Sequence, residues 1–188
     1  MRFKKPLVLS LVALWFLSTT ALVLAMNKNL SKAFDHDMRL SMQLMSLDFE
    51  TQFVDVLHAH SSPNTNTLFH ITSDDGCFCQ NLAKKHMAKL NEIVAGRDFA
   101  IKELNISALD AVKAAIPSTP AVAVVNDQNK LIYLGPYSRG SGCFGSNGEV
   151  NAILENATSA PTDAAQQTYL QPAIIVTEAR GCYCNDEG

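Results

Sequence analysis

The pair Cys77 and Cys79 constrains the fold more than any other feature, because it stands where one predicted element ends and the next begins. The apolar run 68–72 before the pair is typical of a buried strand, and apolar residues recur at helical spacing over 82–94. A thiol in the first turn of a helix faces unpaired backbone N–H groups and the positive end of the helix dipole, which favour its thiolate form. The pattern therefore predicts that Cys77 is a nucleophile and Cys79 its partner, whereas His86, two turns further on, is expected to pack.

A Thr-Pro pair marks a second point of defined geometry. Thr119 and Pro120 stand directly before the apolar run 121–125, where a cis proline can end a loop at the edge of a sheet. Four polar residues then separate this run from residues 130–134, and such spacing indicates a β-hairpin. A glycine-rich loop and a short helix ending near Asn156 complete the predicted globular part.

In the order strand, cysteine pair, helix, strand, helix, Thr-Pro, hairpin and final helix, residues 67–156 resemble the thioredoxin-like superfamily. The resemblance implies an α/β fold with a central mixed sheet flanked by helices, and thiol–disulfide exchange as the activity. It also implies that Thr119 and Pro120, with the proline in cis, shape a substrate groove beside Cys77 and Cys79. The chain departs from the family pattern because its cysteines are spaced C-x-C rather than C-x-x-C and do not follow a tryptophan.

The N-terminal residues predict a membrane-targeting segment. Arg2, Lys4 and Lys5 precede the stretch 6–26, which contains no charged residue. Positive charge on this side keeps it in the cytoplasm and sends the rest of the chain outward. The apolar length favours an uncleaved single-pass anchor in the cytoplasmic membrane, with the domain in the periplasm. Signal cleavage at residues 23–25, which would leave a soluble periplasmic protein, is the alternative.

Between residues 30 and 57, apolar side chains recur at helical spacing with charged residues between them. This pattern predicts one long amphipathic helix, whose apolar face either docks on the domain or mediates self-association. Met38, Met42 and Met45 share that face, and we expect them to fill the core, although thioether sulfur is also a ligand for Cu(I). The chain thus divides into an anchor or signal segment (1–26), an amphipathic helix and linker (27–66), the thioredoxin-like domain (67–157) and a C-terminal connection, strand and cysteine-pair tail (158–188).

The motif Gly-Cys-aromatic-Cys occurs a second time, at residues 181–184, again after an apolar run. Chain direction predicts that a strand at 173–177 runs toward the edge of the sheet where Cys77 lies, which brings Cys182 and Cys184 to the same site. The hairpin likewise returns the loop carrying Cys143 to this edge. All three cysteines are candidates for resolving or relaying a disulfide. The alternative is a C-terminal pair that forms its own small disulfide.

Five cysteines in an exported chain leave three functional interpretations. The first is a thiol–disulfide oxidoreductase, whose partners are protein thiols or disulfides and a redox donor. In the second, the two C-x-C pairs hold Zn²⁺ or Cu(I), and in the third the disulfides are structural parts of a binding module. The helix-start cysteine and the Thr-Pro pair favour the first, for which we expect no metal and no cofactor. A net charge of −3 provides no basic surface for nucleic acid.

Overall fold

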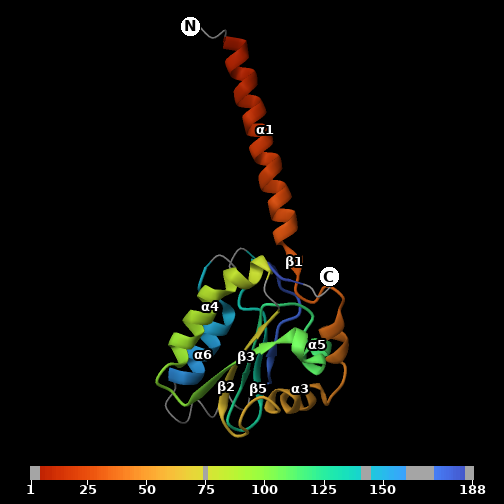
Figure 1. Cartoon of the computed structure of the whole chain (residues 1–188), viewed down its shortest axis with the longest axis vertical. Helices are drawn as coiled ribbons and strands as arrows, with labels where there is room; N and C mark the ends of the chain where they lie inside the picture. Colours follow the sequence, from red (N-terminus) through yellow and green to blue (C-terminus); the bar gives the residue numbers. More distant parts are fainter. Residues whose placement is uncertain (1–4, 74–75, 141–144, 160–171, 185–188) are drawn as a thin grey trace.

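The computed structural model describes residues 5–73, 76–140, 145–159 and 172–184. Its first element is the 26-residue helix α1 (Lys5–Leu30), which projects from the rest of the protein (Figure 1). Within the described ranges, α1 is the one helix long and apolar enough to cross a membrane, through its stretch Lys5–Ala25. Its length and composition suit a membrane anchor or a signal sequence.

A five-stranded mixed sheet forms the centre of the protein, with the strand order β3-β2-β4-β5-β6. The strands are β2 (Asn66–Thr72), β3 (Phe99–Asn105), β4 (Ala121–Val125), β5 (Leu131–Gly135) and β6 (Ile174–Ile175). β2 lies parallel to β3 and antiparallel to β4, whereas β5 lies antiparallel to β4 and parallel to β6. β4 and β5 are buried along their whole length, as their unbroken apolar sequences require.

Helices cover both faces of this sheet. α4 (Phe78–Val94) and α6 (Glu149–Ser159) lie together on one side, and α3 (Phe49–His58) and α5 (Asp110–Ala115) lie together on the other (Figure 1). A short 3-10 turn, η1 (Ile106–Ala108), precedes α5. The α/β class, the mixed sheet and the flanking helices are therefore as predicted.

Local predictions for the part of the chain that builds the site are also confirmed. The β4–β5 hairpin is present, and the peptide bond between Thr119 and Pro120 is cis. α4 ends just before Gly96, whose φ of 73° lies in the left-handed region that glycine tolerates. These elements place the start of α4 and the Thr-Pro bond near the same edge of the sheet.

One prediction for the N-terminal part is wrong, because residues 30–57 do not form one long helix. The chain forms β1 (Lys32–Ala33), α2 (Arg39–Gln43) and α3 instead. Asp35 accounts for the break, since its carboxylate accepts hydrogen bonds from the backbone N–H groups of Leu40 at 3.1 Å and Ser41 at 2.8 Å. Met38 has a φ of 58°, which a continuous right-handed helix excludes.

Residues 34–57 nevertheless pack into the core formed by the sheet. Their fully or almost fully buried apolar side chains are Phe34, Leu40, Phe49, Phe53, Val54 and Leu57. The three methionines do not join them: Met38, Met42 and Met45 are 63%, 61% and 84% exposed. The expectation that they fill the core is wrong. It assumed that the three methionines share one face of a single long helix, and residues 30–57 do not form that helix.

Candidate functional site: a four-cysteine centre

The first cysteine pair sits at the start of α4, as its place in the sequence predicts. β2 ends at Thr72, and Cys77 is the residue that caps the N-terminus of α4, with an extended backbone (φ −77°, ψ 119°). Its carbonyl oxygen accepts a hydrogen bond from the N–H of Gln80 at 3.2 Å, which closes the first turn. Cys77 and Cys79 are both half-buried. The unpaired N–H groups of the helix start therefore lie beside a cysteine that solvent can reach.

The second pair reaches the same edge from the C-terminal end of the chain. β6 runs parallel to β5, and the N–H of Val176 donates to the carbonyl of Leu134 at 2.8 Å. This direction is the one predicted for residues 173–177. The short strand β7 (Arg180–Gly181) follows and leads directly into Cys182 and Cys184.

The two pairs are joined to each other by two disulfides. Cys77 bonds Cys184 with a Cα–Cα distance of 6.3 Å, and Cys79 bonds Cys182 with a Cα–Cα distance of 5.3 Å. Cys77 and Cys79 are therefore not bonded to each other, and the alternative of a separate C-terminal disulfide is wrong. At a helix start, side chains two residues apart, such as those of Cys77 and Cys79, point to different sides and do not face each other. The extended C-terminal segment crosses this helix start, so Cys184 can bond Cys77 while Cys182 bonds Cys79.

The sulfur atoms form a compact group. Those of Cys77, Cys79 and Cys184 all lie within 4.8 Å of one another, and Cys182 is bonded to Cys79. Cys182 is only 4% exposed, whereas the other three are half-buried. We call these residues the four-cysteine centre. At such distances a thiolate released from one disulfide lies next to the other, so the group can exchange bonds internally or, when reduced, offer several thiolates to a metal ion.

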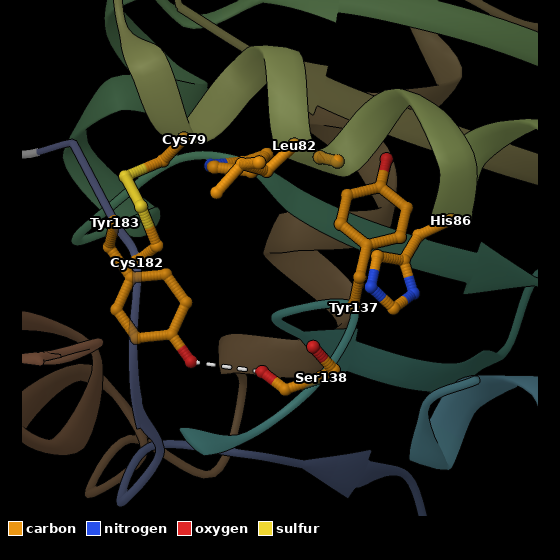
Figure 2. A pocket seen from close by; sticks show the side chains of 9 residues that line it. Cys79, Leu82, His86, Tyr137, Ser138, Cys182 and Tyr183 are labelled. Carbon is orange, nitrogen blue, oxygen red and sulfur yellow. Dashed lines mark hydrogen bonds between the residues drawn. A yellow bond between two sulfur atoms is a disulfide. The ribbon is translucent and has the colours of Figure 1, made fainter. Parts of the chain in front are cut away.

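Thr119 and Pro120, the residues predicted to shape a substrate groove, contact the C-terminal pair. The N–H of Thr119 donates to the carbonyl of Cys184 at 3.0 Å, and the N–H of Cys184 donates to the carbonyl of Thr119 at 2.7 Å. Pro120 lines a small pocket together with Cys79 and Cys182. Figure 2 shows the Cys79–Cys182 bond at this pocket. The backbone edge of Thr119 is therefore occupied by the protein's own C-terminal segment.

A family model for a domain of unknown function, DUF6436, matches residues 46–186. The chain belongs to the DUF6436 family. Neither the curated proteins nor the solved structures compared with the chain include a match. The DUF6436 match begins just before α3 and includes both cysteine pairs, so the four-cysteine centre lies within the family domain.

The N-terminal segment holds the cysteine tail of the DUF6436 domain in place. β1 pairs antiparallel with β7, and the N–H of Phe34 donates to the carbonyl of Ala179 at 2.8 Å. The ring of Phe34 meets that of Tyr183 edge-on at 5.3 Å, and the Tyr183 hydroxyl donates to the carbonyl of Ser138 at 3.1 Å (Figure 2). Sequence reasoning missed the role of Phe34, because a predicted helix hid the short strand β1 that directly precedes it.

Tyr137, which lines the pocket, belongs to a network of hydrogen-bonded polar side chains with His70 and Asn91. His70 Nε2 is 2.9 Å from Asn91 Oδ1, which can only accept, so the other ring nitrogen of a neutral His70 accepts from the Tyr137 hydroxyl at 2.6 Å. Burial lowers the pKa of His70, and burial raises the pKa of Tyr137 well above 10.0. His86 is 1% exposed and packs against Tyr137, on the other side of the pocket from the Cys79–Cys182 bond (Figure 2).

His70 makes the stability of the domain depend on pH. Because the folded protein lowers the pKa of His70 below its ordinary 6.5, the unfolded chain binds a proton more readily below that pH. Stability should therefore be complete above pH 6.5 and fall on acidification, by at most about 1.4 kcal/mol per pH unit. Urea unfolding between pH 5 and 8 measures this slope. His70→Gln should remove this component, and the matched control His60→Gln, at an exposed position, should keep it.

The remaining candidate, Cys143, lies outside the described residues. The glycine-rich loop that carries it begins after β5, at the edge where the four-cysteine centre lies. Its role as a resolving cysteine therefore stays a prediction.

Proposed function

We propose that this protein is an exported, membrane-tethered thiol–disulfide oxidoreductase with a thioredoxin-like domain. The observation that carries the proposal is the four-cysteine centre itself, in which the sulfur atoms of Cys77, Cys79 and Cys184 lie within 4.8 Å at the start of a helix. Inert structural disulfides have no need of a half-buried cysteine at a helix N-terminus, whereas a thiol that reacts at neutral pH benefits from both features.

The arrangement of the sheet supports the thioredoxin-like part of the proposal. The run β3-β2-β4-β5 combines a parallel pair with an antiparallel hairpin, and its strands belong to elements that follow one another along the chain as the resemblance implies. The cis bond before Pro120 adjoins the cysteines, as the resemblance implies. β1, β7 and the cysteine tail are additions to this arrangement.

In the proposed reaction, the thiolate of a substrate dithiol attacks the sulfur of Cys184. A bond between the substrate and Cys184 forms, the Cys77–Cys184 bond breaks, and Cys77 leaves as a thiolate stabilised by the start of α4. The second substrate thiol then displaces Cys184. The substrate loses two electrons and two protons and becomes a disulfide, and Cys77 and Cys184 become thiols.

The second disulfide provides a further step of the same chemistry. The Cys184 thiolate attacks the Cys79 sulfur, which forms a Cys79–Cys184 bond and releases the buried Cys182 as a thiol. No electrons enter or leave in this step. As a result, the disulfide moves from the pair Cys79–Cys182, in which Cys182 is only 4% exposed, to the pair Cys79–Cys184, in which both cysteines are half-buried.

Stepwise reduction tests this proposal. Substoichiometric dithiothreitol, followed by alkylation of free thiols and peptide mapping, should first label Cys77 and Cys184, because both are half-buried and one is a favoured leaving group. Cys182 should be labelled only after this first bond has opened, because the internal exchange that releases it requires the Cys184 thiolate. If both disulfides resist reduction until the protein unfolds, the pairs are structural and the redox proposal is wrong.

A soft metal site is the second candidate function. Three sulfur atoms within 4.8 Å of one another match the thiolate grouping that Zn²⁺ or Cu(I) prefers, once the disulfides are reduced. The fully reduced sample from the same experiment decides between the two. One equivalent of Zn²⁺ retained through dialysis, with a raised melting temperature, supports the metal site. Reduced protein that melts unchanged with excess Zn²⁺ removes it.

A further inference from the structure

The four-cysteine centre is tied directly to the end of α1. α1 ends at Leu30, and β1 begins at Lys32, which lies opposite Gly181 in β7. Cys182 is the next residue along the chain. Figure 1 shows α1 leaving the domain at the end where α4 begins.

Chain geometry limits how far the centre can lie from the helix. Two residues span at most about 7.5 Å, an antiparallel pair adds at most about 5.5 Å between Cα atoms, and one further residue adds about 4 Å. The Cα atom of Cys182 is therefore within about 17 Å of that of Leu30. This limit follows from the β1–β7 pairing and does not depend on the direction in which α1 points.

The connection is packed rather than flexible. Phe34 is fully buried and donates its N–H to Ala179, and its carbonyl accepts the Ser118 hydroxyl at 2.6 Å. Ser31 is the single residue between α1 and β1. A linker that allowed free reorientation would need many residues without such contacts.

The length of α1 places this connection at the membrane surface. The apolar stretch Lys5–Ala25 is 21 residues long, or about 32 Å as a helix, which matches a hydrocarbon core of about 30 Å. Residues 26–30 add about 8 Å, comparable with one headgroup layer. β1 then begins where the headgroups end.

These distances leave little room for a folded partner. A small soluble domain is about 30 Å across, which exceeds the separation of about 17 Å between Cys182 and the helix end. Phe78, between the two cysteines of the first pair, is 58% exposed at this same face. A cysteine in a short loop of a membrane-embedded protein fits this space, and a large soluble substrate does not.

We propose that the four-cysteine centre faces the membrane surface and exchanges its disulfides with a thiol carried there by an integral membrane protein. This inference rests on the proposed redox function and on α1 remaining as an anchor. Intact mass of the membrane-extracted chain checks the anchor: retention of α1 is required, and a mass corresponding to loss of residues 1–25 would overturn the inference.

A fluorescence experiment tests the placement without involving any cysteine. The full chain carries Trp15→Phe and a new tryptophan, Phe78→Trp or Asn81→Trp at the centre, or Gln128→Trp in the β4–β5 hairpin as the control. In vesicles whose phosphatidylcholine headgroups carry a nitroxide, tryptophan at position 78 or 81 should be quenched at least about twofold more than at position 128, because contact quenching acts only at short range. Equal quenching of all three would overturn the placement even if thiol exchange is active.

A lipid-borne thiol then tests the partner. Vesicles containing phosphatidylethanolamine with a thiol on its headgroup should reduce the centre, with two lipid thiols forming one lipid disulfide for each protein disulfide opened. Twelve Gly/Ser residues inserted between Leu30 and Ser31 should slow this reaction about fivefold or more, because a flexible link lowers the effective concentration of the lipid thiol.

Dithiothreitol is the matched probe in solution. Its rate of reduction should be unchanged by the insertion, which separates the two proposals. Inactivity toward both reductants refutes the redox function itself. Activity with dithiothreitol together with a lipid-thiol rate that the insertion leaves unchanged refutes only the membrane-borne partner.

Discussion

A variant with Cys77, Cys79, Cys182 and Cys184 all replaced by serine is expected to unfold with a free energy about 5 kcal/mol below that of the oxidised protein. The two disulfides join residues 107 and 103 positions apart. A crosslink that closes a loop of this size restricts the unfolded chain by about 4.7 kcal/mol in the chain-entropy model. Urea unfolding, monitored by far-ultraviolet circular dichroism, measures this difference in unfolding free energy. If the variant is only marginally stable, both proteins are measured in sucrose.

The two variants that lack one disulfide each are the matched controls. Cys77→Ser with Cys184→Ser keeps the Cys79–Cys182 bond, which closes almost the same loop. Because the second crosslink then encloses only a few further residues, each double variant should lose well under half of the full amount. The contrary result would be that the two double variants each lose much unfolding free energy and that their losses add up to the loss of the variant with four serines. Each disulfide would then stabilise the native state through its own contacts.

The part of the fold that was predicted correctly is the part set by local pattern. Continuous apolar runs gave β2, β4 and β5, and the Thr-Pro pair before β4 located a cis bond. Strand directions then followed from connectivity, and they sufficed to bring the second C-x-C motif to the first. The assembly of the centre was therefore predictable in outline.

The part that was missed depends on contacts between distant residues. The helix predicted over 30–57 fails because the carboxylate of Asp35 binds two backbone N–H groups ahead of it, which no helical periodicity reveals. The pairing of Lys32 with Gly181 spans almost the whole chain, so no local signal marks β1. The disulfide connectivity was missed for the same reason, because it is fixed by how the tail crosses the start of α4.

Cys77→Ser is expected to lower the rate at which the oxidised protein converts a model dithiol peptide into its disulfide by about 100-fold or more. The change removes the leaving group that the start of α4 favours. The measurement is peptide disulfide formed per protein under single-turnover conditions, followed by mass.

The variant Cys184→Ser tests whether Cys77 itself is reactive when its disulfide with Cys184 is absent. This variant retains the Cys77 thiol at the start of α4 but lacks the residue that bonds it, so a peptide disulfide should form a lasting mixed disulfide with Cys77. Lys85→Ala, which removes an exposed side chain from the same helix, should react as the unchanged protein does. If Cys184→Ser and Cys77→Ser are equally unable to form the mixed disulfide, the helix start does not activate Cys77. The bond to Cys184 would then be structural, because a thiol that merely closes a loop has no reason to react faster than any other half-buried cysteine.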